Sequence, residues 1–564
     1  MAKSYNKTTV ETKTLDDHLI NMENVFSTKF RRYLPSPAII VALSVLIILA
    51  GQVRFIQDDA FISFRYAHNL AQGNGLVWNI GEHVEGYTSF LWVIIMSIPH
   101  FLGINVELFS YLVGLSFFAG ALYIFDRIMN ERGFSIWQKC LGFLVLGTNY
   151  VFLSYATSGM ETMLVTLWIT LLLLIVVLTE HTPQESQYYI VFSLVLCLAL
   201  LTRLDAAIVA FPMIIMMAIR FHRYQKLADT PTFLKMMIPW MFFGIWFVWK
   251  VQYYGHLLPN TFAVKAATIT SYRQGFIYVL LFVVGNIAFA LIYRLIHTLS
   301  SRKMPNRFAL VLGSSIILQM VYLIYVGGDF MDLRMFVVIM PLCTLLFLDT
   351  AKTKPLVFLI TVWLLVANQI AGRLLADSRT DLLSYTGVDT IFALEQYIHG
   401  ADHQWEYLGT TIGETLDHDP SVSLAVGPIG AIGYFSETTV IDMHGLTDDW
   451  VAHQGIIWST RPGHQRVAPL SYLQDRKVNL IIGFPHVLDH ASIPKELARV
   501  YEFIWFIPVE QLAQLPPQTT IVRIPLQYEK YAYALYLTPH PSIDQAIKTG
   551  LWTSEPLAKL FSKN

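Results

Sequence analysis

The chain has 564 residues, of which 54% are hydrophobic and only 14% charged, and its mean hydropathy is +0.49. These values are rare for a water-soluble protein of this length, so the composition indicates a polytopic membrane protein. The formal net charge is −1 and no Lys/Arg-rich run occurs, which argues against nucleic acid as a partner. Redox chemistry is not indicated, because the apolar runs enclose the cysteines without disulfide or metal-ligand spacing, at Cys140, Cys197 and Cys343.

The first 36 residues are polar and end in the basic residues Lys29, Arg31 and Arg32, just before the first apolar run. This order predicts an uncleaved anchor with residues 1–36 in the cytoplasm, not a cleavable signal peptide. About 20 apolar residues are needed to cross the hydrocarbon core of a bilayer. Eleven segments are therefore expected to be transmembrane helices: 37–53, 106–125, 138–154, 160–178, 188–203, 204–220, 233–251, 275–295, 308–326, 335–350 and 355–376.

Two apolar stretches need interpretation. The run 90–103 is short and contains Pro99, which favours a helix lying against the outer membrane surface. Arg203 and Asp205 interrupt the stretch 188–220, which could be one tilted helix or two short ones. Two short helices are favoured, because an unpaired arginine in the bilayer centre is costly and a turn would place it at the outer interface.

The resulting topology follows the positive-inside rule. Basic short loops fall on the cytoplasmic side, at residues 127–139, 220–226, 294–307 and 351–354. The fold class is thus mostly α: a transmembrane domain at 37–376 with a large first outer loop at 54–105, followed by a soluble α/β domain at 377–564 outside the cytoplasm. In that last segment short apolar strands alternate with glycine turns, as in SLAVGPIGAIGYF and VNLIIGFP.

Polar motifs gather on the predicted outer side. They are QDDAFISFRYAHNLAQGNGLVWNIGEHVEGYTSFLW, TSGMET, TRLDA, YYGHLLPNTFAVKAA and GGDFMDLR. One outward-facing site is the simplest explanation. The cytoplasmic loops contain no Walker motif, so a nucleotide donor is not indicated. An enzyme on the outer face would need an activated donor delivered within the membrane, such as a polyprenyl-phosphate sugar.

The residues of these motifs suit glycosyl transfer. A carboxylate must take the proton of the acceptor hydroxyl, and Asp58 and Asp59 could supply it. Adjacent residues point about 100° apart on a helix, so one acid is expected to face the reaction and the other to orient it or cap the helix. The candidate cations for the leaving phosphate are Lys265, Arg203, His256 and Arg334. The aromatic residues suited to stacking on a sugar or to the interface are Tyr87, Trp78 and Trp92.

Each motif also has a structural interpretation. The acid pair could cap a juxtamembrane helix, and TSGMET could be a helix start with Thr157 or Ser158 as N-cap and Glu161 in a capping box. Arg203 and Asp205 could form a buried ion pair, and the other basic residues could be interfacial anchors. The glycine-rich residues 427–433 depart from GxGxxG and predict a tight turn from strand to helix.

An acidic pair in a large first outer loop, many spans and a C-terminal outer domain resemble the GT-C glycosyltransferases. The chain is most similar to their arabinofuranosyltransferase B group, in the motifs above and in GAIGYFSETTVIDMHGLTD. The resemblance implies an inverting transfer with no cofactor and no catalytic metal, in which Asp58 is the base and Asp59 supports it. It also implies that residues in matching motifs bind acceptor or donor, namely Glu85, Asp329 and Asn260.

The implied activity is transfer of arabinofuranose from a polyprenyl-phosphate donor to an extracytoplasmic glycan or protein, by an enzyme of the bacterial inner membrane. Three alternatives remain open. The same fold could transfer mannose or aminoarabinose to protein or lipid A. The abundance of Ile, Lys, Gln and Tyr also fits a relative that decorates pilin or a surface polysaccharide. A lipid-linked sugar flippase would use the same outer pocket for binding alone.

Overall fold

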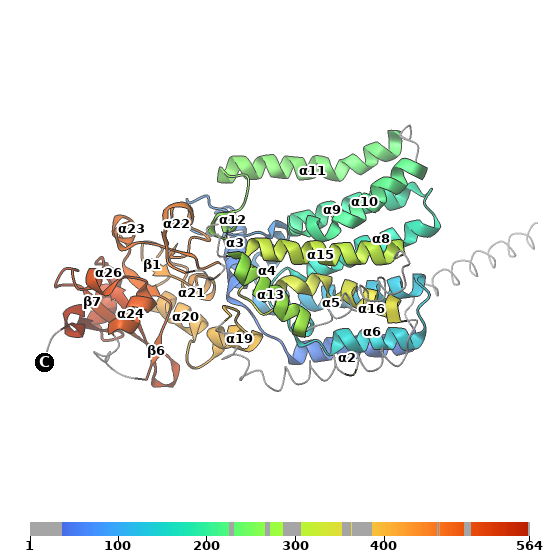
Figure 1. Ribbon diagram of the computed structural model, residues 1–564. Coiled ribbons are helices and arrows are strands. Elements are labelled where there is room, and N and C mark those ends of the chain that lie inside the picture. The colour runs from blue at the N-terminus through green and yellow to red at the C-terminus, as the bar shows by residue number, and fades with distance from the viewer. Residues whose placement is uncertain are drawn as a thin grey trace, which may run out of the picture. The chain divides into compact units, whose positions relative to one another are not determined.

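The computed structural model describes residues 36–224, 230–265, 271–285, 306–351, 363, 386–459, 461, 463–489 and 498–561. Residues Leu46–Asn564 form one compact unit, and Met1–Val45 form another. The fold is mostly helical with a C-terminal α/β part, as the sequence predicted (Figure 1).

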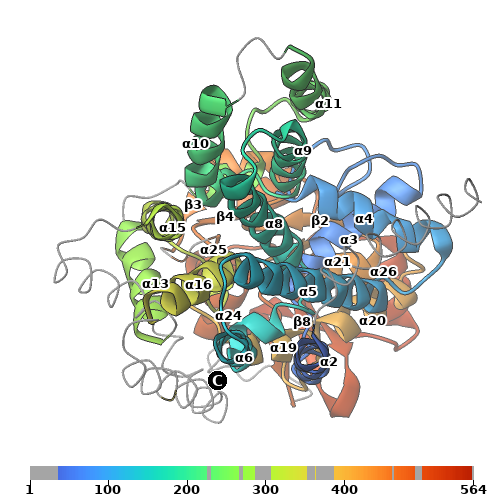
Figure 2. The same cartoon turned by 90° about the vertical axis from the view of Figure 1, so that its right-hand side faces the viewer.

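The N-terminal part of the chain contributes helices. Their bounds are α2 Pro37–Gln52, α3 Asp58–Ala71, α4 Phe90–Leu102, α5 Val106–Glu131, α6 Ile136–Gly147, α7 Tyr150–Ser154, α8 Thr162–His181, α9 Ser186–Thr202, α10 Ala206–Tyr224, α11 Thr230–Tyr254, α12 Asn260–Lys265, α13 Ser271–Gly285, α15 Arg307–Val326, the 3-10 helix η1 Arg334–Ile339 and α16 Met340–Ala351. In both views α5 and α8 lie side by side, and α11 packs beside α9 (Figures 1 and 2).

Five of the described helices are long and apolar enough to cross a membrane: α5, α8, α10, α11 and α15. Shorter apolar helices include α2, α4, α6, α9 and most of α13. These helices identify a membrane protein. The predicted span 355–376 lies outside the described residues except for Trp363, as does the end of the span 275–295.

The predicted break at Arg203 is confirmed, because α9 ends at Thr202, Arg203 is extended and α10 begins at Ala206. Two other predicted spans are not single α-helices throughout. The segment 138–154 divides into α6 and α7, since the Asn149 side chain accepts a hydrogen bond from the Phe152 amide and starts a new helix. The segment 335–350 begins as η1 and continues as α16.

The C-terminal part combines helices and strands. Its helices are α19 Ile391–His399, α20 Trp405–Thr415, α21 Gly430–Ser436, α22 Asp449–Gln454, α23 Leu470–Asp475, α24 Ala498–Trp505, α25 Val509–Leu512, η3 Gln527–Glu529, α26 Pro541–Lys548 and η4 Leu557–Leu560. Its strands are β1 Ser423–Val426, β2 Thr439–Asp442, β3 Ile456–Ile457, β4 Arg466–Val467, β5 Leu480–Gly483, β6 Val487–Leu488, β7 Thr520–Pro525, β8 Tyr531–Tyr536 and β9 Thr553–Pro556.

The main sheet has the strand order β2-β1-β5-β8-β7-β9, with β6 also on β8. Strands β2, β1 and β5 are parallel, and the remaining pairs are antiparallel. All four residues of β1 and of β5 are buried, as expected for parallel strands covered on both faces. The predicted turn from strand to helix at residues 427–433 is confirmed, because it joins β1 to α21.

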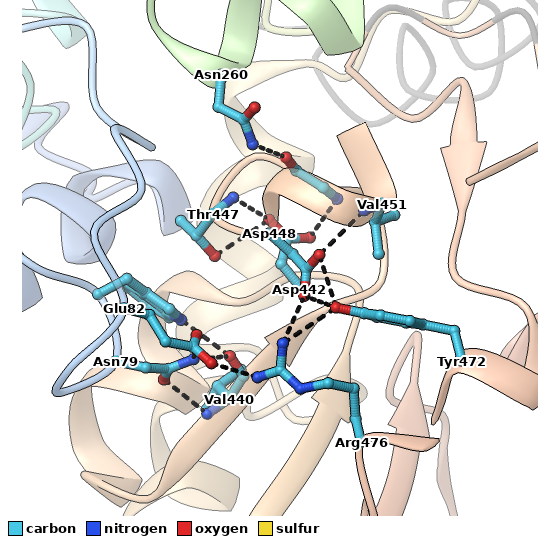
Figure 3. Close-up of polar contacts among 12 residues, drawn as sticks. Asn79, Glu82, Asn260, Val440, Asp442, Thr447, Asp448, Val451, Tyr472 and Arg476 are labelled. Carbon is cyan, nitrogen blue, oxygen red and sulfur yellow. Dashed lines mark hydrogen bonds and ion pairs between the residues drawn. The ribbon is translucent and has the colours of Figure 1, made fainter. Parts of the chain in front are cut away.

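The loop between α3 and α4 contacts the free edge of this sheet at β2. The Asn79 side chain accepts a hydrogen bond from the Val440 amide (3.0 Å) and donates one to the Val440 carbonyl (2.9 Å), as Figure 3 shows. It thereby satisfies edge groups that would otherwise be open to pairing with another chain. Arg476 of the C-terminal part forms an ion pair with Glu82 of the same loop.

Candidate functional site

A cavity of about 530 Å³ lies within the unit Leu46–Asn564. This volume falls in the range of roughly 300–1,000 Å³ that is typical of small-molecule sites. Its walls come from the start of α3, the loop at residues 86–89, the break between α9 and α10, the segment around η1 and the C-terminal part. Of the residues predicted for the site, five line it: Asp58, Asp59, Tyr87, Arg203 and Arg334.

The two adjacent acids differ in their surroundings. Asp58 is 8% exposed, and its carboxylate accepts hydrogen bonds from the amides of Gly430 (3.0 Å) and Ala431 (2.8 Å) at the start of α21. Burial is the main reason that the pKa of Asp58 rises to about 7, although these amide bonds oppose the rise. Asp59 is partly exposed and lines the same cavity. The acids therefore have separate environments.

Helix α3 is fixed against the C-terminal part beyond this contact. The buried guanidinium of Arg65 donates hydrogen bonds to the carbonyls of Gly433 and Thr438, each at 2.6 Å, and to the carbonyl of Trp78 at 2.9 Å. Only glycine fits at position 430, since a Cβ there would lie 1.9 Å from the backbone oxygen of Asp58. The start of α3, which carries the acid pair, is therefore held against α21 both at Asp58 and at Arg65.

Arg203 lies in a buried cluster of charges on the cavity wall. It forms ion pairs with Glu161 (2.7 Å) and Asp205 (2.8 Å), so the predicted Arg203–Asp205 pair is confirmed. The predicted capping box at TSGMET is wrong. Helix α8 begins only at Thr162, Glu161 makes no cap hydrogen bond because its carboxylate is paired with Arg203, and the Thr157 hydroxyl accepts from the Phe55 amide.

Arg334 reaches the cavity from the start of η1. One of its terminal nitrogens forms an ion pair with the fully buried Asp329 (2.6 Å), and the other approaches the sulfur of Met160 (3.5 Å). Its Nε has no hydrogen-bond partner among the described residues. Arg334 therefore retains donor capacity, whereas the nitrogens of Arg203 are all directed at Glu161, Asp205 or Thr88. Asp329 positions Arg334 and is not itself among the residues that line the cavity.

Besides Asp329, three further predicted residues are not among those that line the cavity. Glu85 is buried and pairs with Lys250 of α11 (2.8 Å), and burial raises the pKa of Glu85 to about 7. The side-chain amide of Asn260 donates to the Gly445 carbonyl (2.7 Å), as Figure 3 shows. His256 is half-exposed and pairs with Asp449 of α22 (3.1 Å). The side chain of Lys265 lies outside the described part of the chain.

The predicted aromatic residues have different roles. Tyr87 lines the cavity, and its hydroxyl lies 3.0 Å from that of Tyr254. Trp78 and Trp92 are buried away from it: the Trp78 indole donates to the Val440 carbonyl and the Trp92 indole to the Gly159 carbonyl. These two tryptophans hold the segment from α3 to α4 in place and do not line the cavity.

The loop after β2 is organised by a buried acid that the sequence analysis did not single out. The Asp442 carboxylate accepts hydrogen bonds from the amides of His444 (2.8 Å), Gly445 (3.0 Å) and Thr447 (2.8 Å). Figure 3 shows the contact with Thr447. Burial raises the pKa of Asp442 to about 7. The loop in turn brings His444 and Leu446 to the cavity.

Sequence reasoning also missed most of the wall that comes from the C-terminal part. Its chemically distinctive residues are Asp389, Tyr397, Trp405, His444, Arg461, His464 and Phe484. Apart from His444, which lies in the quoted motif GAIGYFSETTVIDMHGLTD, and Phe484, which lies in VNLIIGFP, these residues stand outside the motifs that the sequence analysis used. Among the described residues, no group of three or more His, Cys, Asp or Glu is placed to hold a metal ion.

Comparisons with known proteins give a partial match. The chain is 26% identical over 337 residues to "Terminal beta-(1->2)-arabinofuranosyltransferase" of Mycobacterium tuberculosis, covering 52% of each chain. It thus spans about half the length of this curated relative. Residues 395–536 match a family described as Domain of unknown function (DUF8728). The first of these matches confirms that the sequence resembles an arabinofuranosyltransferase.

Two solved structures are similar in fold. One is ArnT from Cupriavidus metallidurans bound to undecaprenyl phosphate, with a TM-score of 0.49, 12% identity and coverage of 89% of this chain and 98% of the other. The second is the arabinofuranosyltransferase AftD from Mycobacteria, with a TM-score of 0.46, 14% identity and coverage of 90% and 40%.

Proposed function

We propose that the protein is a GT-C membrane glycosyltransferase that moves arabinofuranose from a polyprenyl phosphate to an acceptor, with inversion at the anomeric carbon. Its site would face the outer side of a bacterial inner membrane, where the polar loops are predicted to emerge. The observation that carries this proposal is that one cavity combines an acid pair, Asp58 and Asp59, with Arg334 as an incompletely bonded cation. The similarity to a mycobacterial arabinofuranosyltransferase supports the choice of sugar.

We assign the base role to Asp59 and a positioning role to Asp58, which reverses the order expected from the family resemblance. Both oxygens of Asp58 already accept amide hydrogen bonds, and the residue is buried. Asp59 is the more exposed acid on the cavity wall. A general base must lie within hydrogen-bond reach of the proton that it takes, whatever its pKa. The more accessible carboxylate, that of Asp59, is therefore preferred.

In the proposed step, the acceptor hydroxyl attacks the anomeric carbon while the Asp59 carboxylate takes its proton. The bond between that carbon and the phosphate oxygen breaks as the new glycosidic bond forms, and polyprenyl phosphate leaves. Arg334 would donate hydrogen bonds to the phosphate as it gains charge. Arg203 would act mainly through the Glu161–Arg203–Asp205 cluster that shapes this wall.

Turnover by the purified full-length chain in lipid nanodiscs tests the proposal. With a synthetic polyprenyl-phosphate arabinose and an acceptor panel, Asp59→Asn should lower the rate by roughly 10²–10⁴-fold, the usual contribution of a general base. Asp58→Asn should retain measurable turnover. Equal activity of Asp59→Asn and the wild type would remove the base assignment. Movement of the lipid-linked sugar across vesicles without any glycosidic product would favour a flippase.

A further inference from the structure

The wall of the cavity that comes from the C-terminal part and from the loop after α15 carries partly exposed aromatic rings. They are Phe330, Tyr397, His464 and Phe484. Tyr397 stacks on Trp405 with ring centroids 4.7 Å apart and an interplanar angle of 8°, and Phe484 meets both rings edge-on. Phe330 meets His464 edge-on at 5.0 Å. These rings, together with Trp405, Asp389 and Arg461, are called the aromatic end of the cavity below.

Hydrogen-bonding groups lie among these rings. Arg461 forms an ion pair with Asp389, and the Tyr397 hydroxyl also hydrogen-bonds Asp389. Trp405 is only 3% exposed, and its indole nitrogen has no hydrogen-bond partner among the described residues. The Nε of Arg461 likewise has no hydrogen-bond partner in the described part of the chain. An unmet buried donor costs about 1–3 kcal/mol, so a ligand that accepts these hydrogen bonds would gain from binding here.

At the aromatic end, the Asp389 carboxylate and the Arg461 guanidinium offset each other. Burial lowers the pKa of the neighbouring His444 to about 4, so its imidazole is neutral near pH 7. The same cavity also presents Arg334 and the Arg203 cluster, which are not part of the aromatic end. The two parts of the cavity therefore suit different groups: a phosphate beside Arg334, and an uncharged molecule with hydroxyls and apolar ring faces beside Tyr397.

We propose that the aromatic end is the acceptor subsite and that it binds the uncharged terminus of a glycan. The apolar faces of the sugar rings would pack on Tyr397 and Phe484, and their hydroxyl oxygens would accept hydrogen bonds from Trp405 and Arg461. This assignment rests on the proposed transferase activity and adds the class of its acceptor. A phosphorylated lipid or a charged peptide would have to compete with the Asp389–Arg461 ion pair for a counter-charge at this end.

Equilibrium binding to the full-length chain in nanodiscs tests the subsite without requiring turnover. The probes are uncharged oligosaccharides of arabinofuranose, mannose and glucose, and the same oligosaccharides carrying a terminal phosphate. At least one uncharged probe should bind, and Phe484→Ala should weaken it by roughly tenfold or more through loss of the aromatic surface. Phe503→Ala is the matched control, because Phe503 is 66% exposed and does not line the cavity.

Trp405→Phe keeps the stack on Tyr397 and removes the indole donor, so it should also weaken the uncharged probe while the protein remains folded. Binding of farnesyl phosphate should be unchanged in all these variants. The inference is overturned if no uncharged probe binds, if the phosphorylated probes bind better, or if Phe484→Ala and Trp405→Phe bind as the wild type does. Glycan binding without product from any donor would instead count against the transferase and leave the subsite standing.

Discussion

At the scale of single residues, Gly430 is a position where a very small change should have a large effect on the site. In Gly430→Ala the new methyl group would meet the backbone oxygen of Asp58 at 1.9 Å, so α21 must shift away from the acid pair. We expect a loss of about 1–3 kcal/mol in stability and a clear loss of turnover. Thermal unfolding and activity measure both. Gly313→Ala in α15 is the control, because nothing lies within 4 Å of its added Cβ.

A second prediction at this scale concerns pH. Burial raises the pKa of Asp58 from its ordinary value of 3.8 to about 7, so between these two values the folded state keeps a proton that the unfolded chain releases. The stability that this proton contributes is fully present below the pKa of the unfolded chain and is lost as pH rises through the pKa of the folded protein. Asp58→Asn removes this titration. Its unfolding temperature should therefore fall less than that of the wild type between about pH 4.5 and 7.5.

The control for the pH experiment is Asp402→Asn. Asp402 is strongly exposed beside Lys530, and its pKa is lowered, so it does not titrate in this range. Its curve should run parallel to that of the wild type. Parallel curves for Asp58→Asn as well would show that Asp58 is ionised throughout and that burial does not control its proton.

The residue-scale features differ in how far the sequence could reveal them. The acid pair and the Arg203–Asp205 ion pair were predicted because their members are neighbours in the chain. The amides that bind Asp58 are 372 and 373 positions away, and Arg461 and Trp405 have no distinguishing local pattern. Such contacts arise only from tertiary packing, so a single sequence contains no signal for them.

At the scale of elements, hydropathy located most of the helices but not their internal breaks. Apolar runs predicted α5, α8, α10 and α15 closely, since a helix within a membrane must be apolar over its length. The break between α6 and α7, and the change from the 3-10 helix η1 to α16, occur inside equally apolar sequence. At the first of these, capping by Asn149 starts the new helix, and hydropathy does not register such a cap.

The attachment of α3 to α21 and β2 gives a prediction at the same scale. Arg65→Leu would leave the carbonyls of Gly433 and Thr438 buried without their donor. We expect a loss of roughly 3 kcal/mol or more, measured by denaturant unfolding in detergent. Lys559→Ala, at an exposed ion pair in the C-terminal part, should change stability by less than about 0.5 kcal/mol. Equal effects of the two would mean that Arg65 does not join these elements.

At the scale of the whole molecule, the proposal depends on membrane topology: the end of α10 and the C-terminal α/β part must lie on opposite sides of the membrane. The basic end of α10 is predicted to be cytoplasmic, and the C-terminal α/β part is predicted to lie outside. Both regions offer an exposed position for labelling, Arg223 at the end of α10 and Lys548 at the end of α26. Because the full chain can be labelled at either position, the test does not depend on truncated fusions.

In a background without Cys140, Cys197 and Cys343, we expect a membrane-impermeant maleimide to label Lys548→Cys in intact spheroplasts. Arg223→Cys should be labelled only after the membrane is permeabilised, because the positive-inside rule keeps its loop in the cytoplasm. Labelling of Arg223→Cys in intact spheroplasts would invert the topology. The cavity would then face the cytoplasm, where a soluble nucleotide sugar could reach it, and the argument for a donor delivered within the membrane would fail.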